Sequence, residues 1–192
     1  MNERRFTLLV MVLRFDDSAT RAERVKKDRL APIRKVFDLV VANCRSNYSP
    51  GPHLTVDEQL VPFRGRCSFK MYIPKKPAKY GIKVVLVCDS DSHYMFNGLA
   101  YLGKDTVKIP RGATLGEVYM SDLVSPFQPS GRRVTTDNFF ATLPLTLSLL
   151  DKDMHLCGTI RQKSYIPKEL MEKVLPPKDS VAVFIYEHNL TL

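Results

Sequence analysis

Long hydrophobic runs are absent from this sequence. The apolar stretch Phe6–Leu13 is far shorter than the about 18 residues that a membrane-spanning helix needs. Charged residues border it on both sides, and no small-residue cleavage site of a signal peptide follows. Membrane anchoring is therefore not predicted. Because apolar residues recur along the stretch at helical spacing, we interpret it as a buried helix.

Motifs for metal binding and nucleophilic catalysis are also missing. The four cysteines form no Cys-x-x-Cys pair, and no histidine lies at ligand spacing from them, so a structural zinc site is not predicted. We expect them to be reduced and mostly buried thiols. No serine lies in a Gly-x-Ser-x-Gly context and no glycine-rich phosphate loop is present, which argues against serine hydrolases and nucleotide-triphosphate binding.

Acidic residues are lacking between Glu58 and Asp89, although basic and aromatic residues are frequent there. The basic residues of this stretch are Arg64, Arg66, Lys70, Lys75, Lys76, Lys79 and Lys83. Interleaved basic and aromatic side chains are typical of a surface that binds a nucleic-acid backbone. A solvated sheet edge protected by lysines is an equally good interpretation of the charge pattern alone.

What is present is the composition of an ordinary globular domain. The 192 residues are 44% hydrophobic and 26% charged, which is enough apolar sequence for a core. The formal net charge of +9 favours an anionic partner, and nucleic acid is the natural candidate once a membrane is set aside.

Hydrophobic periodicity predicts helices first and a mixed sheet afterwards. The predicted helices cover residues 1–17, a charged segment 18–31 that is a helix or loop, a segment after Pro32, and residues 114–123 and 139–150. The predicted strands are 54–63, 68–73, 82–88, 132–136, 154–160 and 181–186. We expect a hairpin at Arg64–Arg66 and irregular structure over residues 89–113.

Two aspartates are the leading candidates for chemistry. Asp57 lies inside the first predicted strand, where a carboxylate is costly unless it faces solvent or binds a cation. Asp137 ends the fourth strand and precedes a predicted helix, so it is either a ligand or a helix N-cap. Together, on neighbouring strands, they could hold Mg²⁺. Paired ions about 4 Å apart support phosphodiester chemistry. Asp89 and Asp91 are weaker candidates, for which turn roles are favoured.

Several motifs occur together in this chain and resemble, in the same order, those of the piggyBac transposases. They are Leu54–Leu60 (LTVDEQL), Phe63–Cys67 (FRGRC), Tyr72–Pro77 (YIPKKP), Lys79–Lys83 (KYGIK), Cys88–Ser90 (CDS), Tyr101–Gly103 (YLG), Thr136–Phe140 (TDNFF) and Gly158–Arg161 (GTIR). The motifs are specific as a set, and they cover nearly the whole chain.

The resemblance implies an α/β fold of the ribonuclease-H-like class, a mixed sheet with flanking helices. By resemblance, residues 1–50 are the helical part of a dimerisation and DNA-binding region. Residues 51–160 are the catalytic core, and residues 161–192 begin a β-rich insertion. Asp57 and Asp137 match two of the three metal-binding aspartates of that family. Residues expected to bind DNA are Arg64, Arg66, Lys70, Lys75, Lys76, Lys79, Arg132 and Arg133.

The resemblance further implies Mg²⁺ or Mn²⁺ as cofactor, double-stranded DNA with transposon ends and a TTAA target as substrate, a homodimer, and a nuclear location. The third aspartate of the family lies in a Gly-Val-Asp motif, and this motif and the cysteine/histidine-rich zinc finger are absent up to Leu192. We therefore expect cut-and-paste DNA transposition as the family reaction but inactivity of residues 1–192 alone. The alternatives are a domesticated DNA-binding or interaction protein without catalysis, and a remnant that does not fold stably.

Overall fold

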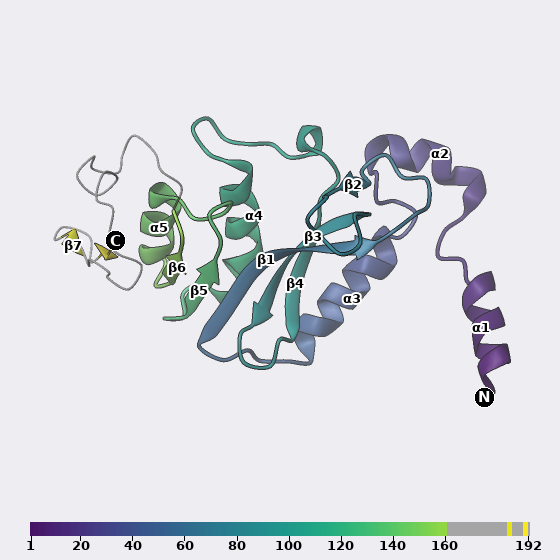
Figure 1. Cartoon of the computed structure of the whole chain (residues 1–192), viewed down its shortest axis with the longest axis horizontal. Coiled ribbons are helices and arrows are strands. Elements are labelled where there is room, and N and C mark those ends of the chain that lie inside the picture. Colours follow the sequence, from purple (N-terminus) through teal and green to yellow (C-terminus); the bar gives the residue numbers. More distant parts are fainter. Residues whose placement is uncertain (161–183, 186–189, 192) are drawn as a thin grey trace.

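The computed structural model describes residues 1–160, 184–185 and 190–191 (Figure 1). The helices are α1 (Glu3–Val12), α2 (Ser18–Lys27), α3 (Arg34–Ser46), η1 (Lys104–Thr106), α4 (Leu115–Val124), η2 (Ser125–Phe127) and α5 (Leu143–Leu150). The strands are β1 (His53–Pro62), β2 (Met71–Tyr72), β3 (Tyr80–Asp89), β4 (Met95–Ala100), β5 (Arg133–Thr136), β6 (His155–Gly158), β7 (Phe184–Ile185) and β8 (Leu190–Thr191).

The main sheet is mixed, with the strand order β2-β3-β1-β5-β6 and with β4 also paired to β3. Strand β1 is antiparallel to β3 and parallel to β5, and β5 is parallel to β6. Strand β1 therefore lies in the interior of the sheet, where the antiparallel part meets the parallel part. This arrangement confirms the predicted mixed α/β sheet.

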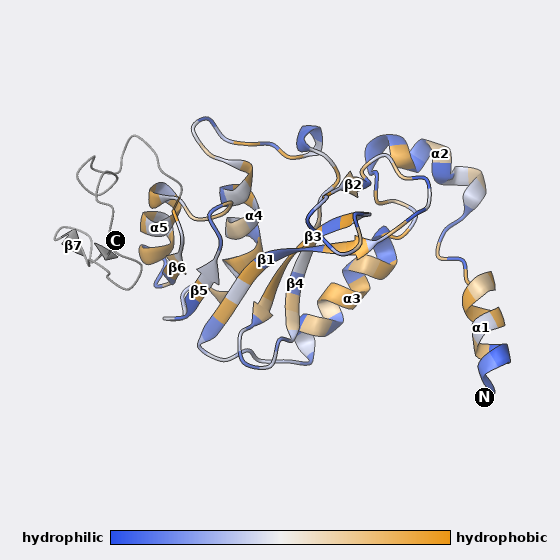
Figure 2. Ribbon diagram, in the orientation of Figure 1, coloured by the Kyte–Doolittle hydropathy of each residue, from blue (hydrophilic) through white to orange (hydrophobic). Residues whose placement is uncertain are grey.

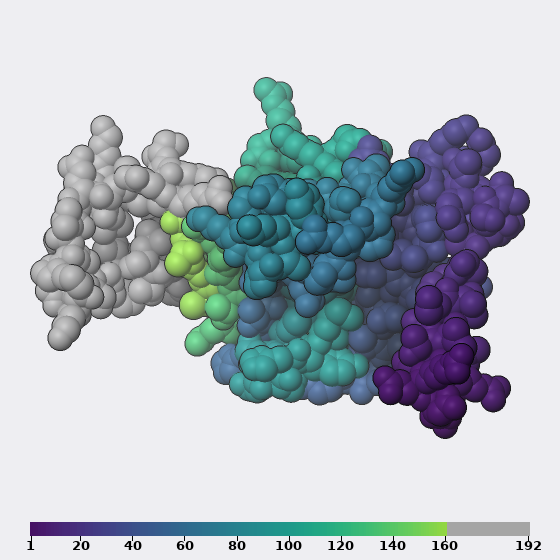
Figure 3. All heavy atoms as spheres, turned by 45° about the vertical axis from the view of Figure 1, so that its right-hand side comes forward, coloured from purple at the N-terminus to yellow at the C-terminus, as the bar shows by residue number. Residues whose placement is uncertain are grey.

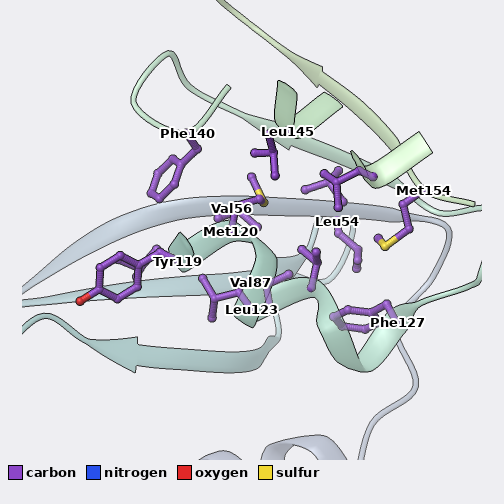
Figure 4. Close-up of a cluster of buried hydrophobic side chains, with 14 residues drawn as sticks. Leu54, Val56, Val87, Tyr119, Met120, Leu123, Phe127, Phe140, Leu145 and Met154 are labelled. Carbon is purple, nitrogen blue, oxygen red and sulfur yellow. The ribbon is translucent and has the colours of Figure 1, made fainter. Parts of the chain in front are cut away.

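Helices cover both faces of the sheet. Val85 and Val87 of β3 belong to the main core with α4 and α5, and Figure 4 shows Leu54, Val56 and Val87 packed against Met120 and Leu123. Ile82 of β3 belongs instead to a second cluster with Phe37 of α3. Because successive side chains of a strand alternate between faces, α3 lies on the face opposite to α4 and α5.

The predicted helix 139–150 begins later than expected, at Leu143. Thr142 is its N-cap, since the Thr142 hydroxyl accepts from the backbone N–H of Leu145 at 3.3 Å. The Thr142 hydroxyl also donates to Glu117, which itself forms a capping box with Thr114 at the start of α4. Because α5 begins only at Leu143, residues 137–142 form a turn before it. The interpretation of Asp137 as the N-cap of this helix is therefore wrong.

The strand predictions failed at β2 and at β4. The predicted strand 68–73 is reduced to β2, which pairs with β3 and not with β1, so Arg64–Arg66 does not form the expected hairpin. Strand β4 lies in the stretch predicted to be irregular. Asn97 and Gly98 hide its β-strand pattern, but the buried Asn97 amide donates to the Leu123 carbonyl at 2.9 Å. At Gly98 an added Cβ would lie 2.9 Å from Leu86.

The predicted strand 181–186 falls largely outside the described residues, and its described part is β7, which pairs with β8.

The cysteines are free, as expected, but the expectation that they are mostly buried is wrong. Cys157 is exposed and the other three are half-buried. Cys157 lies on β6, which ends the main sheet, and Cys88 lies on the same face of β3 as Ile82, the face that carries α3.

The N-terminal helices lie outside the main core. Neither α1 nor α2 has a buried residue, and Phe6 and Met11 of α1 are 57% and 69% exposed. The prediction of a buried helix at Phe6–Leu13 is therefore wrong: periodicity identifies an apolar helix, but not a surface that covers it. Figure 2 shows the apolar residues of α1 in orange, and Figure 3 shows the N-terminal segment as a lobe at the edge of the molecule.

The helix after Pro32 is confirmed as α3, although its apolar face is only partly covered. Val41 is buried, whereas Leu39 and Val40 are exposed. Within the described residues, no helix combines the length and the apolar character needed to cross a membrane.

Candidate active site

Asp57 lies in the middle of β1 with its side chain exposed. Val56 and Leu60 lie on the face of β1 that packs into the core, so Asp57 lies on the other face. One carboxylate oxygen, Oδ1, accepts a hydrogen bond from the backbone N–H of Glu58 at 2.7 Å. This bond orients the carboxylate from within the strand.

Asp137 follows β5 directly and lies beside Asp57 in the sheet. The parallel pairing of β1 with β5 ends at Val56 and Thr136, so the two aspartates occupy the next position on each strand. The Thr136 hydroxyl donates to the Val56 carbonyl at 2.9 Å and ties the strands together at this point. Neighbouring strands lie about 4.8 Å apart, and residues in register on parallel strands share a face.

The turn after β5 orients the Asp137 carboxylate. Asp137 Oδ1 accepts from the Phe139 N–H at 3.0 Å, and the Asp137 carbonyl accepts from the N–H groups of Phe140 and Ala141. Both aspartates thus have one oxygen held by a backbone N–H group. In each carboxylate the oxygen held in this way is Oδ1.

Two exposed carboxylates in register on adjacent strands form a suitable partial ligand set for a hard divalent cation, which prefers oxygen ligands. Among residues 1–160, 184–185 and 190–191, no three His, Cys, Asp or Glu side chains are grouped closely enough to hold a metal ion. The structure therefore brings the two predicted aspartates together without a third acidic partner in the described residues.

Most of the predicted DNA-binding residues lie in the loop 63–79, between β1 and β3, which we call the basic loop. Arg64, Arg66, Lys75 and Lys79 are exposed, and Lys70 and Lys76 are half-buried. The Arg64 guanidinium lies 5.2 Å from the centre of the Tyr80 ring, and the Lys70 ammonium donates to the Gly65 carbonyl at 3.0 Å. The loop thus presents several cations at the end of β1.

Arg132 and Arg133 lie at the opposite end of β1, because Arg133 pairs with His53. Arg132 donates to the carbonyls of Gly51 and Pro50 at 3.0 and 3.1 Å and lies over the Phe127 ring. Its guanidinium therefore has a role within the fold, whereas Arg133 is exposed. Both arginines lie apart from the basic loop, and their binding to DNA stays a prediction.

Asp89, the weaker candidate, closes a turn as expected. It is buried and accepts from the N–H groups of Ser92, Gly51 and Asp91 at 2.7–2.9 Å. Hydrogen bonds from the Ser92 and Gly51 backbone lower the pKa of Asp89 to about 2. The carboxylate is saturated by the protein, which distinguishes it from Asp57 and Asp137.

Sequence reasoning missed the group formed by Glu58, Lys76, Lys83 and Phe139, whose Glu58 follows Asp57 on β1 but lies on the other face of the sheet. Strand alternation offered a signal, since it places Glu58 on the apolar face of β1 with Val56 and Leu60. A carboxylate at such a position requires cationic partners, but their identity depends on contacts between distant segments.

The mixed sheet with helices on both faces, and with acidic residues at the junction of β1 and β5, defines the ribonuclease-H-like class of fold. A family model described as transposase IS4 matches residues 1–191, so the chain belongs to that transposase family. It is also similar to a piggyBac transposase, solved by cryo-EM as a synaptic complex with hairpin DNA, with 44% sequence identity and a TM-score of 0.84. The predicted resemblance to piggyBac transposases is thereby confirmed.

This similarity covers 96% of the present chain and 39% of the solved relative. The chain thus corresponds to a part of that transposase, and the DNA in the solved complex belongs to the relative.

Proposed function

We propose that this chain is part of the catalytic domain of a piggyBac-type DNA transposase, with residues 51–160 as the catalytic core. The single observation that supports this proposal best is the register of β1 and β5, which puts Asp57 and Asp137 side by side. Family membership and the similarity to a piggyBac transposase support the same reaction class.

The two aspartates would hold Mg²⁺ or Mn²⁺. Each is an exposed carboxylate with one oxygen fixed by a backbone N–H, which fits a hard ion that prefers oxygen ligands and keeps several waters. When bound, such ions activate water and stabilise the leaving oxygen in phosphodiester cleavage. The side chains of the protein contribute orientation, because Asp57 is fixed within a strand and Asp137 by the turn before α5.

Double-stranded DNA would be the substrate, with transposon ends and a TTAA target as in the piggyBac transposases. The exposed cations of the basic loop suit the phosphate backbone. Residues 1–50 would contribute to DNA binding and to a homodimer, and a nuclear location follows from a chromosomal substrate. Residues 161–192, proposed as the start of an insertion domain, lie mostly outside the described residues.

Mn²⁺ binding to the purified chain tests the proposal directly. Asp57→Asn and Asp137→Asn should each weaken binding by roughly tenfold or more, because loss of a ligand costs at least as much as loss of its supporting partners. Asp38→Asn is the matched control, since Asp38 is an exposed carboxylate on α3. Equal Mn²⁺ affinity in the wild type and both site variants would exclude the metal site.

A strand-cleavage assay and DNA-binding titrations separate catalysis from binding. We expect residues 1–192 alone to bind DNA with a steep salt dependence and to cleave it little. Robust metal-dependent cleavage that Asp57→Ala abolishes would show an active enzyme. Salt-dependent DNA binding without any metal binding would instead identify a domesticated DNA-binding protein.

A further inference from the structure

Glu58 follows Asp57 on β1 but lies on the opposite face of the sheet, between the buried side chains of Val56 and Leu60. Its side chain is only 21% exposed. A carboxylate so far withdrawn from water is unfavourable unless cations or hydrogen-bond donors surround it. Two lysines from different segments approach it.

Lys83 of β3 connects Glu58 to the turn that carries Asp137. Its ammonium lies 4.0 Å from Glu58 Oε2 and 4.6 Å from the centre of the Phe139 ring, and its side chain is 14% exposed. The Phe139 N–H, in turn, donates to Asp137 Oδ1. A continuous series of contacts therefore runs from the residue after Asp57 to the group that orients Asp137.

Lys76 connects Glu58 to the basic loop. Its ammonium donates to the Glu58 carbonyl at 3.3 Å and lies 3.7 Å from Glu58 Oε1. Strand β5 pairs with β1 only as far as Val56, so the Glu58 carbonyl lies on the edge of β1 that β5 leaves open. Lys76 covers this edge and keeps the loop against the strand that carries Asp57.

We propose that Glu58 is a positioning residue for the Asp57–Asp137 pair. It holds Lys83 against Phe139 and Lys76 against β1, and it neutralises charge that would otherwise lie beside a cation site. Without Glu58, both ammonium groups would be free to repel a divalent cation or to pair with the site carboxylates. The metal part of this inference rests on the proposed function, whereas the orientation of the turn does not.

The test combines amide exchange, followed by NMR, with Mn²⁺ affinity, followed by the EPR signal of the free ion. Glu58→Gln should speed exchange of the Phe139 N–H by roughly fivefold, as loss of a partly desolvated cation–π contact implies. It should weaken Mn²⁺ binding by a similar factor. Glu23→Gln is the matched control, because Glu23 forms an exposed ion pair with Lys26 on α2, and it should change neither quantity.

Variants of Lys83 provide an independent test of the same contacts, together with a conservative control. Lys83→Met should reproduce the faster exchange of the Phe139 N–H, but it should not weaken Mn²⁺ binding, because it also removes a cation that Glu58 neutralises. Lys83→Arg keeps a cation over the Phe139 ring and should retain nearly wild-type exchange. The double variant Glu58→Gln/Lys83→Met should speed Phe139 exchange no more than the larger single change does, because both residues act on Phe139 through one series of contacts. If Glu58→Gln does not fold, as a thermal melt would show, Lys83→Met carries the same test of Phe139 exchange.

Unchanged Phe139 exchange in Glu58→Gln, or fully additive changes of that exchange in the double variant, would overturn the positioning role. If Asp57→Asn leaves Mn²⁺ affinity unchanged, the proposed metal site fails, and Phe139 exchange still decides whether Glu58 fixes the Asp137 turn. A general loss of stability without a local change at Phe139 also counts against the proposal.

Discussion

The two halves of β1 differ in how the sheet supports them. From Leu54 to Val56 the strand has β3 on one side and β5 on the other, and Leu54 and Val56 are fully buried. From Asp57 to Pro62 it retains only β3, and Val61 is 43% exposed. Asp57 lies at the boundary, where a core strand becomes an accessible one.

This boundary explains how one strand can be both rigid and open. The first half fixes the backbone through hydrogen bonds on both sides, while the second half leaves side chains and a backbone edge accessible to a partner. A carboxylate two residues earlier, at Thr55, would lie on a half-buried position flanked by β3 and β5, and one placed later would lack the neighbouring Asp137. Functional groups on well-supported elements are held more accurately than groups on loops.

The largest effect on the free energy of unfolding is expected for Leu54→Ala, compared with Leu60→Ala. The two substitutions remove the same atoms from the two halves of β1. Leu54 is fully buried and Leu60 is 8% exposed. We expect the free energy of unfolding to fall by about 4 kcal/mol for Leu54→Ala and by about 2 kcal/mol for Leu60→Ala. Urea unfolding followed by circular dichroism measures both. Equal losses would mean that double pairing does not make the first half more rigid.

A smaller effect on stability is expected from substitution of Asp89, which pairs with Leu54 in the first half of β1. Its folded-state pKa of about 2 is below the unfolded value, so the ionised carboxylate stabilises the fold above the unfolded pKa. This contribution is lost as the pH falls through the folded pKa. Asp89→Asn should therefore lower the unfolding midpoint at pH 7, and the difference should shrink in strong acid. A pH-independent difference would contradict this assignment.

Next in size is a comparison of Arg132 with its neighbour Arg133. Arg132→Ala should lower the free energy of unfolding by about 1–2 kcal/mol, because it leaves the Pro50 and Gly51 carbonyls without their charged donor. Arg133→Ala at an exposed position should stay within about 0.5 kcal/mol of the wild type. Thermal melts of both variants provide the measurement. A larger loss of stability in Arg133→Ala than in Arg132→Ala would contradict the structural role of Arg132.

The smallest effect should occur in the second half, at the open edge of β1. Lys76→Met removes the donor to the Glu58 carbonyl and should cost about 0.5 kcal/mol, since the pair is partly exposed. Lys75→Met, at the preceding exposed position, should leave the unfolding free energy unchanged. Urea titrations in low and high salt compare the two, and an equal response at both positions would argue against edge protection by Lys76.

Local pattern predicted the elements that carry the site but not their partners. Alternation identified β1, β-branched residues identified β3 and β5, and the motifs identified the family and both aspartates. The predictions failed where the outcome depended on distant neighbours. The apolar α1 has no cover in the described residues, and β4 contains Asn97 and Gly98, which become compatible with a strand only opposite Leu123 and Leu86.

The sequence by itself determined where β1 and β5 run and which of their residues are acidic, because strand periodicity is a property of neighbouring residues. The tertiary structure alone decided that Val56 pairs with Thr136, 80 residues away, and hence that Asp57 and Asp137 lie together. It also decided that Lys76 and Lys83 converge on Glu58. Strand register and ion pairing between distant segments depend on the packing of the whole sheet, which no local pattern contains.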